Sequence, residues 1–195
     1  MTTDTFLIIG LGNPGREYRN NRHNIGFMLI DRLAVALNAQ KVSMQSKAIV
    51  TSVLDGVRKI ILAKPQTYMN LSGRSVQGLI NFYKLPLDRL LIAHDDLDLP
   101  YGTIRLRPGG GPGGQKGMAS TIDYLGTNQF PRLRLGIGRP PGRMDPAAYV
   151  LQDFSREDVK VLPEILDRAA QAVQSYIQDG LDIAMNRFNG AVFEK

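Results

Sequence analysis

The chain has 195 residues, of which 43% are hydrophobic and 22% charged, proportions that predict one globular domain spanning residues 1–195. It contains no cysteine, which excludes disulfides, thiol nucleophiles and thiolate metal sites. No segment approaches the roughly 18 apolar residues of a membrane span, and the first residues lack a basic export signal. We therefore expect a soluble cytoplasmic protein with no membrane partner.

The net charge of +6 is concentrated in one segment. From Tyr101 to Arg143 the chain has a single acid, Asp123, and an excess of bases that equals the whole net charge. The bases are Arg105, Arg107, Lys116, Arg132, Arg134, Arg139 and Arg143. Such a segment either forms a solvated basic surface or binds an anionic partner, and its concentration favours the anionic partner.

The first half of the chain shows apolar runs, helical spacing and turn residues. Asp55 and Gly56 separate two apolar runs and predict a hairpin, and therefore an antiparallel element. Asn70 or Ser72 is expected to cap the second helix, which Pro86 stops. The expected strands are 6–11, 48–54 and 59–63, and the expected helices begin near residue 25 and near residue 70.

The second half of the chain alternates between strand and helix patterns. Ser155, with Asp158 three residues later, forms a capping box at the start of the last helix, which Gly180 ends. The expected strands are 89–93, 104–107 and 132–137, and a helix is expected over 116–125. Strands that alternate with helices, together with one hairpin, predict an α/β fold with a mixed sheet.

The first strand leads into the letters GLGNPG, which match the glycine pattern of dinucleotide-binding loops. A dinucleotide site needs a helix that begins inside the glycine motif, so that its amide groups face the pyrophosphate. Here Asn13 and Pro14 make a turn, and the polar stretch REYRNNRHN delays the helix until about Ile25. We therefore expect a ligand-binding turn at the end of a strand but no dinucleotide.

Two histidines, His23 and His94, are available for a histidine-based mechanism. A histidine side chain in water titrates at about pH 6.5, so at pH 7 it is mostly neutral and able to accept a proton. His94 is followed by Asp95, Asp96 and Asp98, a grouping that suggests a divalent metal site. Successive strand residues point to opposite faces, however, so Asp95 and Asp96 are not expected to share a metal ion.

Four motifs, in order and with similar spacing from the first strand to the last helix, resemble those of bacterial peptidyl-tRNA hydrolases. They are GLGNPGREYRNNRHNIG, KPQTYMNLSG, AHDDLDLPYGTIRLRPGGG and FPRLRLGIGRP. The resemblance implies a mixed twisted sheet surrounded by helices, in a monomer that works without a metal or another cofactor. It also implies hydrolysis of the ester between a peptide and the 3′-terminal ribose of tRNA, with peptidyl-tRNA as the partner during translation.

The resemblance assigns roles to the polar residues of these motifs. It makes His23 the general base that activates water and Asp95 the acid that orients its imidazole, and a base of this kind contributes about 10²–10⁴ in rate. It makes Asn13 the residue that reads the peptide group next to the ester, which an amide can do because it both donates and accepts. Asn70 corresponds to the asparagine that holds substrate and water.

Further positions match residues that the family uses against tRNA. Tyr18 and Tyr68 correspond to aromatic residues that line the site for the 3′ end, where bases or ribose stack. Met69 is expected to shape the wall of the site, although core packing explains a methionine equally well.

Arg107 and Arg134 match basic positions that the family uses against tRNA. The strand period places Arg105 with Arg107, and Arg132 with Arg134, on one face of each strand, and such pairs suit phosphate groups. If these four cations each meet a phosphate, affinity falls about 50-fold between 50 and 200 mM salt.

One motif departs from the family. Where members usually have G-G-H-N-G, this chain has Gly113-Gly114-Gln115-Lys116-Gly117, so a histidine becomes glutamine and a substrate-binding asparagine becomes lysine. Lys116 keeps a hydrogen-bond donor but loses the acceptor. Contact with the peptide or the 3′ end is therefore altered, and a phosphate contact from Lys116 is one replacement.

Three other functions fit parts of the sequence. The changed Gln115-Lys116 pair favours a non-catalytic RNA-binding member of the same fold. The GLGNPG letters suggest a nucleotide-dependent oxidoreductase, against which Pro14 and the late helix count. A hydrolase of some other ester is the third, and the clustered arginines argue for a polyanionic leaving group instead of a small one.

Overall fold

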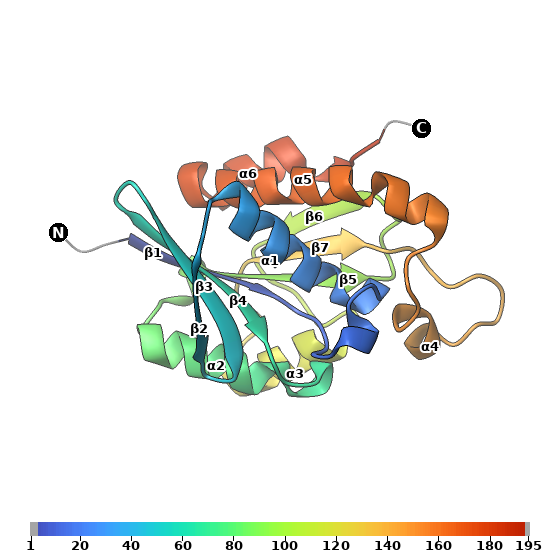
Figure 1. Cartoon of the computed structure of the whole chain (residues 1–195), viewed down its shortest axis with the longest axis horizontal. Helices are drawn as coiled ribbons and strands as arrows, with labels where there is room; N and C mark the ends of the chain where they lie inside the picture. The colour runs from blue at the N-terminus through green and yellow to red at the C-terminus, as the bar shows by residue number, and fades with distance from the viewer. Residues whose placement is uncertain (1–3, 194–195) are drawn as a thin grey trace.

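The computed structural model describes residues 4–193, which contain one eight-stranded sheet between two layers of helices (Figure 1). The strands follow the order β2-β3-β4-β1-β5-β7-β6-β8 across the sheet. Their bounds are β1 (Asp4–Gly10), β2 (Lys41–Gln45), β3 (Ala48–Asp55), β4 (Arg58–Pro65), β5 (Leu90–Asp96), β6 (Thr103–Arg107), β7 (Arg132–Gly136) and β8 (Gly190–Ala191).

The centre of the sheet is parallel and its sides are antiparallel. Strands β4, β1, β5 and β7 run in one direction, whereas β2 and β3 on one side, and β6 and β8 on the other, add antiparallel pairs. The carboxyl ends of the parallel strands therefore meet at one edge, which is where ligands bind in open α/β sheets. The predicted α/β class with a mixed sheet is confirmed.

Helices cover both faces of the sheet. Figure 1 shows α1, α5 and α6 on one face and α2 and α3 on the other. Side chains alternate between the two faces of the sheet along β1, so the strand contributes to two hydrophobic cores. Phe6 and Ile8 pack with α1 and α5, and Leu7 and Ile9 pack with α2 and α3. The helices are α1 (Ile25–Ala36), α2 (Ser72–Tyr83), α3 (Lys116–Leu125), α4 (Pro146–Val150), α5 (Arg156–Asp179) and α6 (Leu181–Phe188).

The chain leaves β1 through an irregular segment. Two short 3₁₀ turns, Arg16–Tyr18 and Arg22–Asn24, precede α1, which begins at Ile25. The helix thus starts well beyond GLGNPG, as predicted, and the geometry of a dinucleotide loop is missing there.

Helix α1 lies unusually close to the sheet. A Cβ atom on Gly26 would lie 2.5 Å from the carbonyl oxygen of Leu11 and 2.7 Å from that of Ala93. Glycine is therefore required at this position, because any side chain would separate the helix from β1 and β5. The close contact fixes the turn before α1 against the carboxyl ends of both strands.

The expected cap of α2 is wrong. Its N-cap residue is Leu71, which makes no side-chain capping bond, because a 3₁₀ turn carries the chain into the helix. Ser72 is already inside the helix and buried, and Asn70 is exposed. The capping box predicted for Ser155 and Asp158 is confirmed, since each side chain bonds the backbone of the other.

The strands β2 and β8 and the helices α4 and α6 were not predicted. Strand β2 lies at the edge of the sheet, and its apolar residues Val42 and Met44 are 66% and 63% exposed. The strand therefore has no buried face whose hydrophobic pattern would predict it from the sequence. Helix α4 and strand β8 are too short to show a period.

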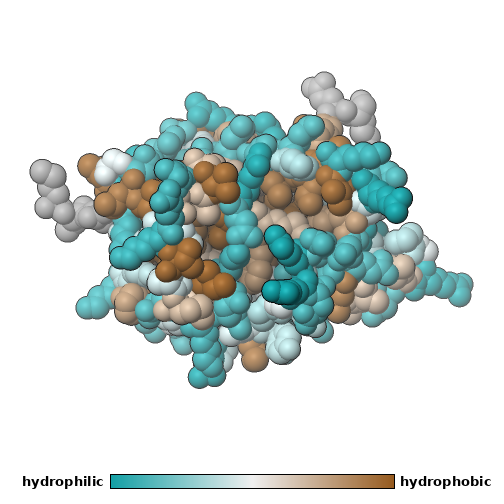
Figure 2. Space-filling model, in the orientation of Figure 1, coloured by the Kyte–Doolittle hydropathy of each residue, from teal (hydrophilic) through white to brown (hydrophobic). Residues whose placement is uncertain are grey.

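Exposed apolar side chains are scattered over the surface, and Figure 2 shows small hydrophobic patches on a largely hydrophilic face.

A helix that crosses a membrane must be both long and largely apolar. Across residues 4–193, no helix is both long and apolar enough to cross a membrane.

Replacing Gly26 with alanine should lower the free energy of unfolding by about 1–3 kcal/mol, the usual cost of an extra methyl group in a packed core. An ordinary glycine-to-alanine change inside a helix instead raises stability by up to about 1 kcal/mol. The sign of the change, measured by urea unfolding, therefore reports the close contact. Unchanged or increased stability would show that α1 tolerates a side chain against the sheet.

Candidate active site

Two neighbouring cavities open at the carboxyl edge of the parallel strands. The first, the His23 cavity, has a volume of about 530 Å³, and the second, the arginine cavity, about 490 Å³. The His23 cavity is lined by Asn13, His23, Tyr68, Met69, Asn70, Asp95, Gln115, Lys116 and residues of α4, among others. The arginine cavity is lined by His94, Asp96, Arg107, Arg132, Arg134 and residues 108–113.

The glycine-rich loop, residues 109–114, separates these two cavities, and Gly113 lines both. A larger cavity of about 840 Å³ also reaches Asn13, but its lining includes neither His23 nor Asp95. Size alone therefore does not locate the chemistry, and the polar residues that the sequence singled out gather in the His23 cavity.

The imidazole of His23 is held by the carboxylate of Asp95. Nδ1 of His23 lies 2.8 Å from Oδ2 of Asp95, and both side chains are buried. A carboxylate only accepts hydrogen bonds, so in the neutral imidazole Nδ1 carries the proton and Nε2 keeps its lone pair. The turn before α1 supplies the histidine and the end of β5 supplies the aspartate. The arrangement leaves a basic nitrogen on a residue that lines the cavity.

The side chain of Asn13 is held at its oxygen. Oδ1 accepts the backbone N–H of Met69 at 2.8 Å, and the Asn24 amide exchanges two bonds of 2.9 Å with the Asn13 backbone. Nδ2 of Asn13 has no hydrogen-bond partner within the described part of the chain. Asn13 therefore has its donor free at the cavity, while its oxygen is held by the backbone of Met69.

Gln115 lies beside Asp95, although sequence reasoning did not place it in the site. Its Nε2 donates to Oδ1 of Asp95 at 3.0 Å and lies 3.2 Å from the sulfur of Met69. The departure from the family motif marked this position, but nothing in the pattern indicated where the side chain points.

The other predicted residues differ in their exposure and in whether they line the His23 cavity. Tyr68, Asn70 and Lys116 are exposed and line it, with Tyr68 60% exposed. Tyr18 is half-buried in the first 3₁₀ turn and lines none of the three cavities. The structure thus brings together the predicted residues of the His23 cavity but leaves Tyr18 outside it.

Arg22, next to His23 in the chain, ties the turn to the segment after α4. Its guanidinium is buried, donates to the carbonyl oxygen of Asp153 at 2.7 Å and lies 4.4 Å from the ring centroid of Tyr149. Asn21 adds a side-chain bond of 2.7 Å to Asp153. Because α4 lines the His23 cavity, these contacts fix that wall relative to the histidine. Sequence reasoning missed them.

Arg107 and Arg134 supply the accessible charge of the arginine cavity. Arg134 donates through Nε to Oδ2 of Asp96 at 2.5 Å, and Arg107 is exposed. The register pairs Arg105 with Arg134 and Arg107 with Arg132, so these arginines share one face of the sheet, as predicted.

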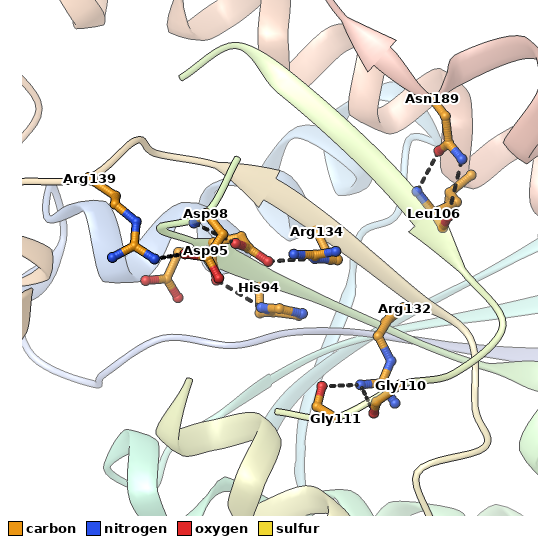
Figure 3. Close-up of polar contacts among 11 residues, drawn as sticks. His94, Asp95, Asp98, Leu106, Gly110, Gly111, Arg132, Arg134, Arg139 and Asn189 are labelled. Carbon is orange, nitrogen blue, oxygen red and sulfur yellow. Dashed lines mark hydrogen bonds and ion pairs between the residues drawn. The ribbon is translucent and has the colours of Figure 1, made fainter. Parts of the chain in front are cut away.

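Arg132 is not available to a phosphate, contrary to the expectation for this face. It is 2% exposed and donates to the carbonyl oxygens of Gly110 and Gly111 (Figure 3). It also donates to the carbonyl oxygen of Asn128. Burial, with the nearby charge of Arg134, lowers the pKa of Arg132 to about 10. The group remains charged at pH 7 and holds the glycine-rich loop in place.

The acids after His94 divide between the two cavities. Asp95 contacts His23 and Asp96 contacts Arg134, so the predicted separation of these carboxylates is confirmed. Within residues 4–193, no group of three or more His, Cys, Asp or Glu side chains is placed to hold a metal ion. Burial lowers the pKa of His94, whose Nδ1 bonds the carbonyl oxygen of Asp95 at 2.8 Å.

The fold and the site define an α/β enzyme in which a histidine pairs with a buried aspartate beside a cationic cavity, an arrangement that suits hydrolysis of an ester carried by a polyanion. Residues 7–195 match the model of the peptidyl-tRNA hydrolase family. The chain therefore belongs to the peptidyl-tRNA hydrolase family and is a hydrolase of the ester bond of peptidyl-tRNA, as the motifs predicted.

Relatives match the chain along nearly its whole length. The peptidyl-tRNA hydrolase of Pseudarthrobacter chlorophenolicus is 46% identical over 97% of this chain and 97% of that protein. That of Desulforamulus reducens is 49% identical over 94% of this chain and 88% of that protein. The crystal structure of peptidyl-tRNA hydrolase from Acinetobacter baumannii matches with a TM-score of 0.88, at 33% identity and 99% coverage of both chains.

His94 should make stability depend on pH. Its pKa in the folded protein is lowered by burial, an effect that Asp95 and Asp96 oppose and Arg132 adds to. As pH falls below about 6.5, the unfolded chain binds a proton that the folded protein does not, so stability is lost. The urea midpoint should therefore drop more in the wild type than in His94→Asn between about pH 7.5 and about pH 5.5. Equal drops would contradict the lowered pKa.

Proposed function

We propose that His23 is the general base of the reaction and that Asp95 orients it. The observation that carries this proposal is the 2.8 Å contact between Nδ1 and Oδ2, because it selects the tautomer in which Nε2 is basic. Nε2 takes a proton from water while the water oxygen attacks the ester carbonyl. The imidazolium then returns the proton to the ribose oxygen as that oxygen leaves. Asp95 stabilises the imidazolium between the two steps.

Asn13 recognises the peptide group next to the ester. Its oxygen is occupied by Met69, so its free Nδ2 donates to the carbonyl oxygen of the substrate's peptide bond. Free aminoacyl-tRNA lacks that carbonyl and forms no such bond. Asn70, exposed at the same cavity, holds substrate and the attacking water.

Contacts with the 3′ end and the peptide fall to the remaining residues of the cavity wall. Tyr68 presents a ring on which a base or ribose stacks, Met69 adds an apolar surface, and Lys116 supplies a cation. Tyr18 lies outside the His23 cavity, in the first 3₁₀ turn. It contacts tRNA only if the 3′ end passes over that turn.

Arg107 and Arg134 bind phosphates of the acceptor stem. Guanidinium groups grip phosphate in bidentate fashion, and Asp96 keeps Arg134 in a fixed position at the cavity. The two cavities adjoin at Gly113, which supports a single substrate that occupies both. We further propose that residues 1–195 form one domain and act as a monomer in the cytoplasm.

The alternative that the sequence left open, a non-catalytic RNA-binding role, depended on the changed Gln115-Lys116 pair. The contacts of Gln115 count against it. The glutamine bonds Asp95 at the oxygen that His23 does not use, so the histidine and the carboxylate remain paired.

His23→Ala should lower kcat for hydrolysis of N-acetyl-aminoacyl-tRNA by about 10²–10⁴, because the base is removed while the groups that bind tRNA remain. Single-turnover assays measure this loss, and filter binding should show unchanged affinity for tRNA. Free aminoacyl-tRNA is the control substrate that the wild type should spare, and EDTA should leave the rate unchanged. A His23→Ala enzyme with wild-type kcat would place the base elsewhere.

Arg107→Ala and Arg134→Ala should each weaken tRNA binding and flatten its salt dependence. The slope of log K against log salt should become shallower by about 0.7–0.9 for each phosphate that the variant no longer neutralises. Lys41→Ala is the matched control, since Lys41 is an exposed cation at the opposite edge of the sheet. Affinities unchanged at low and high salt in both arginine variants would show that tRNA binds elsewhere.

A further inference from the structure

Gln115 occupies the junction between the glycine-rich loop and α3, where the sequence departs from the family motif. The glutamine is 7% exposed and Asp95 is 2% exposed. The two oxygens of the Asp95 carboxylate have separate partners, because Oδ2 bonds His23 and Oδ1 bonds Gln115. The amide is thus a second donor on the carboxylate that holds the histidine.

Helix α3 sets the orientation of the Gln115 amide. Oε1 accepts the backbone N–H of Met118 at 2.7 Å, which makes Gln115 the N-cap of the helix. With the oxygen held there, Nε2 faces Asp95 at 3.0 Å. A flipped amide would bring two oxygens together at Asp95 and leave the N–H of Met118 without its acceptor.

The second bond restrains the carboxylate. A carboxylate with one partner rotates about the bond to its β-carbon, and any rotation of Asp95 moves the atom that holds His23. A buried charged oxygen without a partner is also costly, so Oδ1 would turn toward another donor if the amide were removed. The orientation of the histidine therefore depends on a side chain that does not touch it.

We propose that Gln115 is a positioning residue, which holds the Asp95 carboxylate in the orientation that presents His23 as a base. The proposal rests on the roles proposed above for His23 and Asp95. It accounts for glutamine where the family usually has histidine, because a neutral imidazole and an amide each provide one donor edge and one acceptor edge. The position requires a donor to Asp95 and an acceptor for α3.

Gln115→Ser separates the two contacts. Serine is a good N-cap but is too short to reach Asp95, so the helix stays capped while the donor is removed. We expect kcat to fall by about 10- to 100-fold, the range seen when a group that orients a functional side chain is removed. KM should stay close to that of the wild type, and the thermal midpoint should fall modestly, because one buried hydrogen bond is lost. Gln115→His, which restores a donor, should recover most of the missing kcat.

Proton NMR of protein with isotope-labelled histidine gives a measurement that needs no activity. The chain has two histidines, and His94→Asn identifies the signals of His94. The Nδ1 proton of His23 should give a downfield signal protected from exchange in the wild type, and a broadened one in Gln115→Ser.

An unchanged His23 signal in Gln115→Ser overturns the proposal, and so does a kcat that stays as low in Gln115→His as in Gln115→Ser. Failure of the proposed function is distinguishable from these results. If His23→Ala keeps full activity, the role of His23 is wrong, yet the NMR signal still decides whether Gln115 positions Asp95.

Discussion

The alternation of side chains at the end of β5 governs the arrangement of the whole site. His94 and Asp96 line the arginine cavity, and Asp95 between them lines the His23 cavity, as the period of two in an extended strand favours. Consecutive acids therefore serve separate purposes, since Asp95 holds His23 and Asp96 holds Arg134. The proposed proton transfer and the proposed anion binding therefore lie in neighbouring cavities, and each relies on its own carboxylate.

Two polar side chains of the His23 cavity are each held at one atom and free at another. His23 is held through Nδ1 and has Nε2 free, and Asn13 is held through Oδ1 and has Nδ2 free. The anchoring bonds are buried, and a buried polar group that loses its partner costs about 1–3 kcal/mol. The free atoms are thereby oriented before substrate arrives, which is the condition for electrostatic preorganisation.

The parts of the site that depend on local pattern were predictable from the sequence, and those that depend on distant contacts were not. Strand period separated Asp95 from Asp96, and the motifs singled out the residues of the His23 cavity. The bonds of Gln115 and Arg22 join residues 20 and 131 positions apart, and no local period reports such pairs. Period also placed Arg132 on the basic face, but only the folded chain shows that the glycine-rich loop covers it.

Gly113 lines both cavities, so one short loop sets the distance between them. Arg132 holds this loop through bonds to the carbonyl oxygens of Gly110 and Gly111. When one end of a ligand binds in the first cavity, its other end is held near the second cavity at a high effective concentration. The affinity for both ends together therefore exceeds the affinity for either end alone. In the mechanism proposed for this enzyme, hydrolysis cuts the bond between the peptide and the 3′-terminal ribose, both of which occupy the His23 cavity. The peptide product is then bound in one cavity only, whereas the tRNA product still contacts both.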